Sequence, residues 1–333
     1  MRSLRLASIP VVAAVLVLGP VANASNDPSF AKQWGLAKIG AEAAWARTTG
    51  ASVKIGIVDT GVDLTHEDLA GKVVENTSCV GSEGDPAKCK GTAQDDQGHG
   101  THVSGIAAAL KDNGKGIAGV APDAKLVVAK VLASTGAGSS NDVTAGIKWV
   151  VDHGAQVVNL SLGDPAQAVT QLFGPGDLNE GIQYAWSHGA IAVVAAGNSN
   201  AAGLGLEGSS YGNVNAIIVG ATGPDDSVAH YSTPTGQAKW AVLAPGGAAD
   251  RKKEDDVYST YWKKGEQNAY GYLAGTSMAA PHVSGAIALL LAEGYSPVNA
   301  VQRLLETADS KVKCGSQSPT CHGRIDVAKA TAK

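Results

Sequence analysis

Short apolar runs rich in β-branched residues alternate with helix-compatible segments along most of this chain. The runs cover residues 53–58, 126–131, 156–160, 190–195 and 216–219, and helix-compatible segments between them cover 99–110, 142–151 and 178–188. Strands that alternate with helices favour a parallel sheet that is covered on both faces. In such sheets, active sites form where the carboxyl ends of the strands meet the following loops.

The first 24 residues read as a secretory signal peptide. A positive start, Met1 to Arg5, precedes an apolar run from Ile9 to Leu18 and small residues that end at Ala24. The apolar run is too short to span a bilayer, which argues against the alternative of an uncleaved anchor. No later stretch is long and apolar enough either, so we expect an exported protein that is soluble once the signal is removed. Residues 25–333 suit one α/β domain, with a monomer as the default.

The charge of the chain argues against a nucleic-acid partner. The net charge is −4, and there is no basic stripe.

The four cysteines fall into two close pairs, Cys79 with Cys89 and Cys314 with Cys321. In an exported chain such pairs favour disulfides, and neither has the Cys-x-x-Cys spacing that would support zinc. Three connectivities are possible, and sequence proximity favours the two local ones.

Four polar residues occupy junctions between the expected elements. Asp59 ends the first strand, His99 opens a glycine-flanked helix start, Asn198 follows another strand, and Ser277 lies in the first turn of an Ala/Leu-rich helix. Each has a plain alternative as a cap or turn residue. His102 lies one turn after His99 and is expected to pack within the fold. The alternative, a metal site formed by the two histidines, lacks the Glu that follows the first histidine in zinc proteases.

Together these four residues supply the parts of a nucleophilic hydrolase. A serine hydroxyl becomes nucleophilic when a base takes its proton, and imidazole suits that task near neutral pH. A carboxylate on the second ring nitrogen fixes the tautomer. Asp59, His99 and Ser277 fit these roles, and the Ser277 backbone N–H with the Asn198 side-chain amide would bind the oxyanion.

The motifs around these residues resemble those of the subtilisin-like serine peptidases, the subtilase family, and within it the thermitase branch. Residues 57–61 read IVDTG, 99–103 read HGTHV and 275–282 read GTSMAAPH, in the subtilase order Asp, His, Ser. The resemblance extends from Asp27 to the C-terminus. It implies a three-layer, doubly wound, mostly parallel α/β fold and a serine endopeptidase of broad specificity. The rival interpretations are a catalytically silent scaffold of this fold and an α/β-hydrolase esterase, which would place serine first, inside Gly-x-Ser-x-Gly.

The resemblance also implies substrate-binding segments. Residues 136–138 and 159–163 would clamp the peptide as an added β-strand, and residues 195–197 with Gly208 would line the main specificity pocket. Small lining residues imply a large apolar P1 side chain, whereas Glu207 would favour a basic one. The residues implied to contact substrate are Gly136, Ala137, Gly138, Ser161, Leu162, Gly163, Ala196, Gly197 and Gly208.

A structural calcium site is implied in the same way. The loop 110–117 matches one that wraps Ca²⁺ in the family, with all-oxygen ligands as this ion prefers. The implied ligands are the side chains of Asp27, Asp68 and Asn113 and the carbonyls of Leu110, Lys115 and Ile117. A second, weaker family site matches residues 92–97 poorly.

Two features depart from the family pattern. Exported subtilases usually carry a pro-region after the signal, and here the enzyme-like sequence starts almost at the expected cleavage point. The insertion that holds Cys79 and Cys89 precedes the His99 motif and is expected beside the rim of the active site.

Overall fold

A single parallel sheet forms the centre of the molecule. The computed structural model describes residues 25–162, 175–198 and 212–332; the expected signal peptide, Gly163, Glu207 and Gly208 lie outside them. Within the described residues the sheet has eight strands in the order β10-β7-β6-β5-β4-β1-β3-β2, and its paired neighbours all run parallel. The strands are β1 Lys54–Asp59, β2 Val73–Ser78, β3 Lys125–Lys130, β4 Val157–Leu160, β5 Ile191–Ala195, β6 Ala216–Thr222, β7 Trp240–Pro245 and β10 Cys321–Arg324.

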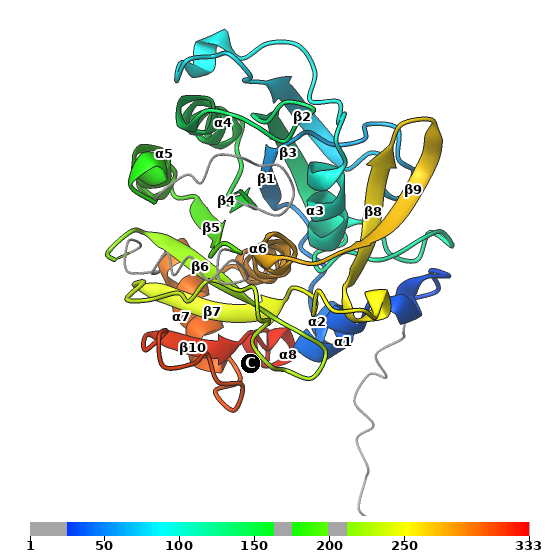
Figure 1. Ribbon diagram of the computed structural model, residues 1–333, viewed down its shortest axis with the longest axis vertical. Helices are drawn as coiled ribbons and strands as arrows, with labels where there is room; N and C mark the ends of the chain where they lie inside the picture. The colour runs from blue at the N-terminus through cyan, green and yellow to red at the C-terminus, as the bar shows by residue number, and fades with distance from the viewer. Residues whose placement is uncertain (1–24, 163–174, 199–211, 333) are drawn as a thin grey trace, which may run out of the picture.

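Helices cover both faces of this sheet and create two apolar cores. On one face lie α3 (His99–Ala108) and α6 (Thr276–Ala292), and on the other α4 (Ser140–Asp152) and α5 (Pro175–Ser187), as Figure 1 shows. Side chains alternate between the two cores along β1, where Ile57 joins the α3/α6 core and Val58 the α4 core. Burial on both faces explains why the strands read as continuous apolar runs.

Helix α6 is buried through most of its length. Its residues from Thr276 to Leu290 are all buried, and it packs against α3 and against strands β4 to β7. A helix that is apolar all round belongs inside a core. The remaining helices lie nearer the chain ends and the loops: α1 Trp34–Ile39, α2 Ala41–Trp45, α7 Pro297–Thr307, α8 Val327–Ala330, and the short 3-10 turns Phe30–Lys32, Glu67–Leu69, Pro86–Lys88 and Lys253–Asp255.

A two-stranded antiparallel hairpin stands apart from the main sheet and leads directly into α6. It consists of β8 (Val257–Lys263) and β9 (Glu266–Leu273). The hydroxyls of Ser259 and Thr260 donate to the carbonyls of His102 and Thr101 at 2.8 and 2.7 Å, which fastens the hairpin to α3. The hairpin thereby links the helix that begins at His99 with the helix that carries Ser277.

The architecture confirms the fold expected from the sequence. Each of the five predicted strands overlaps an observed strand, and the four predicted helices correspond to α3, α4, α5 and α6. Strands β2, β7 and β10 and the β8–β9 hairpin were not predicted. Strand β2 is partly exposed at the edge of the sheet, so its sequence lacks a continuous apolar run. Among the described residues, no helix combines the length and the apolar character that a membrane span requires.

Candidate active site

The four junction residues lie where the sequence placed them, at the carboxyl edge of the sheet. Asp59 is the last residue of β1, His99 the first residue of α3, and Ser277 the second residue of α6. Asn198 follows the end of β5 by three residues. Because α3 and α6 pack against each other on one face of the sheet, the four segments meet at one edge.

Asp59 and His99 form a direct contact. The Nδ1 atom of His99 lies 2.8 Å from Oδ1 of Asp59, whose side chain is fully buried. The same oxygen accepts the backbone N–H of Thr60 at 2.7 Å. A carboxylate at Nδ1 makes that nitrogen the donor and leaves Nε2 to act as the acceptor. The close fit needs glycine at position 100, where a Cβ would come within 2.1 Å of the Gly61 carbonyl oxygen.

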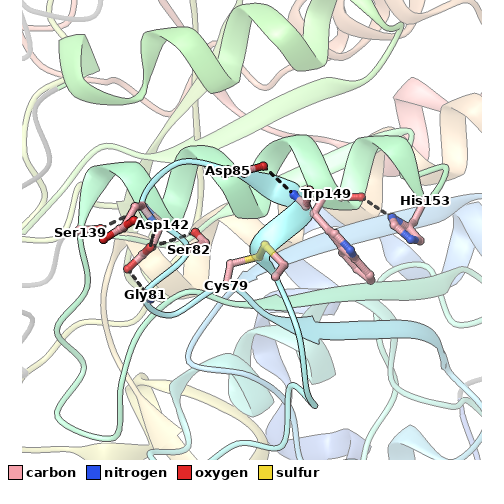
Figure 2. Close-up of a disulfide and its surroundings, with 11 residues drawn as sticks. Cys79, Gly81, Ser82, Asp85, Ser139, Asp142, Trp149 and His153 are labelled. Atoms are coloured by element: carbon pink, nitrogen blue, oxygen red, sulfur yellow. Dashed lines mark hydrogen bonds between the residues drawn. A yellow bond between two sulfur atoms is a disulfide. The ribbon is translucent and has the colours of Figure 1, made fainter.

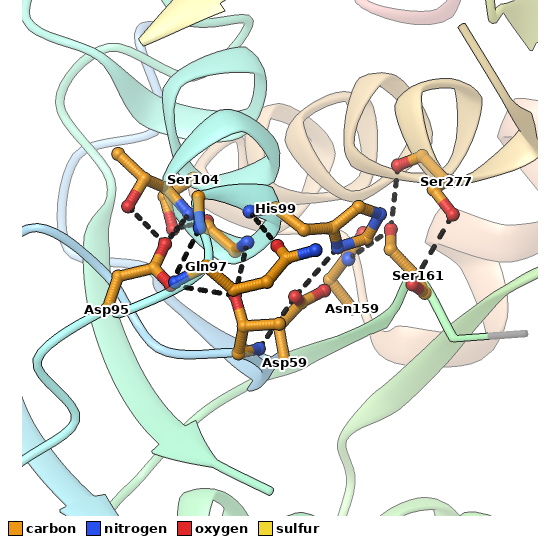
Figure 3. A network of polar contacts seen from close by, with 12 residues as sticks. Asp59, Asp95, Gln97, His99, Ser104, Asn159, Ser161 and Ser277 are labelled. Atoms are coloured by element: carbon orange, nitrogen blue, oxygen red, sulfur yellow. Dashed lines mark hydrogen bonds and ion pairs between the residues drawn. The ribbon is translucent and has the colours of Figure 1, made fainter. Parts of the chain in front are cut away.

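A second buried carboxylate, Asp95, organises the start of α3. It accepts the backbone N–H groups of Gly98 and Thr101 at 3.0 and 3.1 Å and the Thr60 hydroxyl at 3.0 Å. The two backbone N–H groups are helix-start donors without intrahelical partners. Gln97 accepts the backbone N–H of His99 at 2.8 Å (Figure 3). Asp95 was not predicted as a site residue; its position four residues before a glycine-flanked helix start was the available signal.

Ser277 lies on the other side of the His99 ring from Asp59 in the view of Figure 3. Its hydroxyl is 3.4 Å from the carbonyl oxygen of Ser161, a long contact, and its side chain is buried at 3% exposure. The Ser277 carbonyl accepts the hydroxyl of Ser161 at 2.8 Å. The end of β4 and the first turn of α6 are therefore joined through Ser161 and Ser277.

The side chain of Asn198 is oriented by Thr276. Its Oδ1 accepts both the backbone N–H and the hydroxyl of Thr276, at 2.9 and 3.0 Å. The Thr276 hydroxyl in turn accepts the backbone N–H of Gly197 at 3.0 Å. With the amide oxygen engaged by Thr276, the Nδ2 donor forms the other end of the side chain and lies close to Gly275. The contacts of Thr276, which lies next to the predicted serine, were not predicted from the sequence.

The segments expected to bind substrate flank the end of β1. Residues 136–138 follow β3, and Ser161 and Leu162 follow β4, the two strands that pair with β1. Ala196 and Gly197 follow β5, and Gly197 adopts a positive φ of 102°. The two glycines at 163 and 208 lie outside the described residues, so the expected pocket base is not described.

The two other histidines on α3 and α6 are structural. The Nε2 atom of His102 lies 3.1 Å from the carbonyl oxygens of Val257 and Gly271, as expected for a residue that packs within the fold. Nδ1 of His282 lies 2.8 Å from the Met278 carbonyl oxygen. Burial lowers the pKa of His102 to about 3 and that of His282 to about 4, so both rings are neutral at physiological pH.

The residues of the expected calcium site converge on one loop. Asp27 accepts the backbone N–H groups of Asp112, Asn113 and Gly114 at 3.0 to 3.2 Å. Asp68 accepts the Asn113 amide, the Ile117 backbone N–H and the Tyr270 hydroxyl at 2.8, 2.8 and 2.9 Å.

Both carboxylates are buried, and burial raises the pKa of Asp68. Among the described residues neither makes a salt bridge. Asn113 here turns its amide nitrogen to Asp68, whereas a calcium ligand would use the oxygen. Tyr270, which comes from β9, was not predicted from the sequence.

Both expected disulfides are formed, Cys79 with Cys89 and Cys314 with Cys321. The first closes a loop that is seated on the start of α4 (Figure 2). There the Asp142 carboxylate accepts the backbone N–H groups of Gly81 and Glu83 and the Ser82 hydroxyl, at 3.0, 3.1 and 3.0 Å. The loop is thus attached to the first turn of α4, the helix that follows the segment 136–138.

Comparison with known proteins agrees with this geometry. A family model described as the subtilase family, peptidase S8, matches residues 50–323. Thermitase of Thermoactinomyces vulgaris is 39% identical over 92% of this chain and 98% of its own length. Subtilisin Savinase of Lederbergia lenta is 36% identical over 90% of this chain and 98% of its own. A protease structure from Pseudoalteromonas arctica PAMC 21717 matches with a TM-score of 0.76 and 29% identity, covering 93% of this chain and 99% of that one.

These matches define the class of the protein as a serine endopeptidase, a hydrolase of peptide bonds. The chain belongs to the subtilase family. The peptidase interpretation is thereby favoured over the silent scaffold and over the α/β-hydrolase esterase.

Proposed function

We propose that Ser277 is the nucleophile of this endopeptidase, with His99 as its base and Asp59 as the residue that orients the base. The observation that carries the proposal is the 2.8 Å contact between His99 Nδ1 and the buried Asp59 carboxylate, next to a serine at a helix start. Nε2 of His99 takes the proton of the Ser277 hydroxyl while Oγ attacks the scissile carbonyl. The imidazolium then gives that proton to the leaving amine, and water hydrolyses the acyl-enzyme by the same route.

Negative charge develops on the substrate carbonyl oxygen during both attacks. The proposed donors are the Ser277 backbone N–H at the positive end of α6 and Nδ2 of Asn198. The two bonds from Thr276 to the Asn198 oxygen support this role, because they hold the amide in one orientation before substrate binds.

The substrate is proposed to bind as an added strand between residues 136–138 and residues 161–162. These segments follow the two strands that flank β1, so a peptide laid between them passes over Asp59. Backbone pairing depends little on side chains, which gives broad specificity. A large apolar P1 residue remains our expectation, since Ala196 and Gly197 offer small walls.

A structural calcium ion is proposed to be held by Asp27, Asp68, Asn113 and the carbonyls of Leu110, Lys115 and Ile117. The fit rests on charge: two buried carboxylates are attached to one loop, and a cation held there would balance them. When bound, the ion would supply that charge and cross-link the N-terminal segment to the loop. We further propose secretion, from the signal-like residues 1–24.

A serine-reactive fluorophosphonate tests the nucleophile. We expect stoichiometric labelling that maps to Ser277 and is abolished in Ser277→Ala, together with a loss of kcat of about 10⁶, the size known for the serine of subtilisin itself. The rise of kcat/KM with pH between 5 and 8 should follow the deprotonation of His99. Activity of Ser277→Ala within tenfold of wild type would overturn the assignment.

A further inference from the structure

Helix α6 lacks one backbone hydrogen bond, the one that would reach the carbonyl of Ser277. Pro281 lies inside this helix, and proline has no backbone N–H. In a regular helix the residue at 281 would donate to the carbonyl of residue 277, four positions earlier. The Ser277 carbonyl therefore lacks the donor four residues on that a regular helix supplies, and an unpaired buried carbonyl is costly.

The hydroxyl of Ser161 replaces the missing donor. It donates to the Ser277 carbonyl at 2.8 Å, and both residues are buried, with exposures of 2% and 3%. Ser161 comes from the end of β4, so the bond fastens the first turn of α6 to the rigid sheet. Figure 3 shows Asn159, Ser161 and Ser277 in this arrangement.

Two further residues fix the direction of this bond. Asn159 Nδ2 donates to Ser161 Oγ at 2.9 Å, and the Ser284 hydroxyl donates to Asn159 Oδ1 at 2.8 Å. A carbonyl can only accept, so the Ser161 hydroxyl must donate its one hydrogen to the Ser277 carbonyl and accept from Asn159. The Asn159 amide must then present its oxygen to Ser284. Every donor along the chain points toward Ser277.

We propose that Ser161, Asn159 and Ser284 are positioning residues for the nucleophile. Their hydrogen-bonded chain leaves α6 at Ser284, crosses β4 and returns to α6 at Ser277. This chain replaces the hydrogen bond that Pro281 cannot make. It also holds the Ser277 backbone, from which both Oγ and the oxyanion-binding N–H project. This inference rests on the proposed role of Ser277, and it gives the Ser161 side chain a task separate from the substrate contact of its backbone.

The first test compares variants that break the chain with a matched control. Ser161→Ala and Asn159→Ala should each lower kcat and the rate of fluorophosphonate labelling about tenfold, the worth of one buried hydrogen bond, with KM little changed. Thr331→Val removes another fully buried hydroxyl, which donates to the Val327 carbonyl at 3.0 Å at the end of α8, a helix that packs against α2 and α7. It should leave kcat and the labelling rate unchanged. Equal kinetic losses in Thr331→Val and Ser161→Ala would overturn the proposal.

The second test restores the helical donor. Pro281→Ala supplies an N–H that can reach the Ser277 carbonyl, so Ser161→Ala should cost less than about threefold in that background, each loss being measured against its own parent. The same tenfold loss in both backgrounds would overturn the proposal.

A second double-mutant cycle, on Ser161 and Asn159, keeps the proposal testable if Pro281→Ala does not fold. Ser161→Ala with Asn159→Ala should cost no more than either alone, because both break one chain; multiplied losses would contradict this. The outcomes separate the two claims: labelling of Ser277 with unimpaired Ser161→Ala removes only this inference, whereas an active Ser277→Ala removes the proposed function.

Discussion

Thr276 holds Asn198 by two hydrogen bonds, one from its backbone N–H and one from its hydroxyl, both to the same amide oxygen. Thr276 is the residue directly before Ser277. The two proposed oxyanion donors, Nδ2 of Asn198 and the N–H of Ser277, are therefore positioned by one short stretch of backbone. A shift of the first turn of α6 would move both donors together.

Replacing Asn198 by Ala should lower kcat by about 10²–10³, with KM little changed, because the lost bond is made mainly in the transition state; this range was measured for the corresponding subtilisin residue. Thr276→Val keeps the backbone N–H bond to Asn198, so it should lose far less. Steady-state kinetics on a peptide substrate provide the measurement. A loss in Thr276→Val as large as in Asn198→Ala would contradict the assignment of the amide as the donor.

Acid should destabilise the fold through His102 and His282. Both have a pKa below the value of about 6.5 in the unfolded chain, so protonation favours unfolding. The free energy of unfolding is fully retained above pH 6.5 and falls as the pH drops toward 4, by about 1.4 kcal/mol per pH unit for each ring.

Urea unfolding of Ser277→Ala at pH 7, 6 and 5 measures this dependence without self-digestion. His282→Gln should roughly halve the slope, whereas His322→Gln, at an exposed position, should leave it unchanged. A free energy of unfolding that is constant between pH 6.5 and 5 would refute the prediction.

Calcium removal should destabilise the enzyme. Asp27, Asp68 and the loop 110–117 are assembled only in the folded chain, so an ion that binds there stabilises by about 4 kcal/mol at a thousandfold excess over Kd. EDTA should lower the Tm of Ser277→Ala and speed self-digestion of the active enzyme near its N-terminus.

Asp68→Ala should show the low Tm with or without calcium. Asp152→Ala, which removes an exposed carboxylate at the end of α4, should still respond to EDTA. A Tm of Ser277→Ala that ignores EDTA would show that the site is wrongly assigned.

The Cys79–Cys89 disulfide and Asp142 restrain the same loop, so their contributions should not add. Removing the disulfide by Cys79→Ser with Cys89→Ser should cost about 2–3 kcal/mol of stability. Adding Asp142→Ala should then cost less than it does in the intact protein.

The second disulfide, Cys314–Cys321, offers the control, because it closes a different loop. Its removal and Asp142→Ala should add. Peptide mapping without reduction should find both local pairs, and four free thiols would refute them. Additive losses for the first disulfide would show that Asp142 does not hold the loop.

Site residues could be predicted from the sequence where they stand at the end of a strand or the start of a helix. Asp59, His99 and Ser277 lie at element ends that hydrophobic patterning could find, and the order of elements brought those ends to one edge of the sheet. Partners from distant segments were missed. Tyr270 reaches Asp68 from a hairpin two hundred residues later, and Asn159 reads as one polar residue in an apolar strand. Only the packing of α6 against β4 reveals that Asn159 faces Ser284.

The hairpin formed by β8 and β9 has a consequence for the order of events during synthesis. It is the connection through which the late part of the chain docks on α3, and it delivers Ser277 to a histidine made long before. Contacts between such distant segments form late, since closing a long loop is unfavourable until the surrounding structure can compensate. An incompletely made chain thus carries the proposed base without the proposed nucleophile, and it becomes able to cut its own kind only once the part from β8 onward has docked.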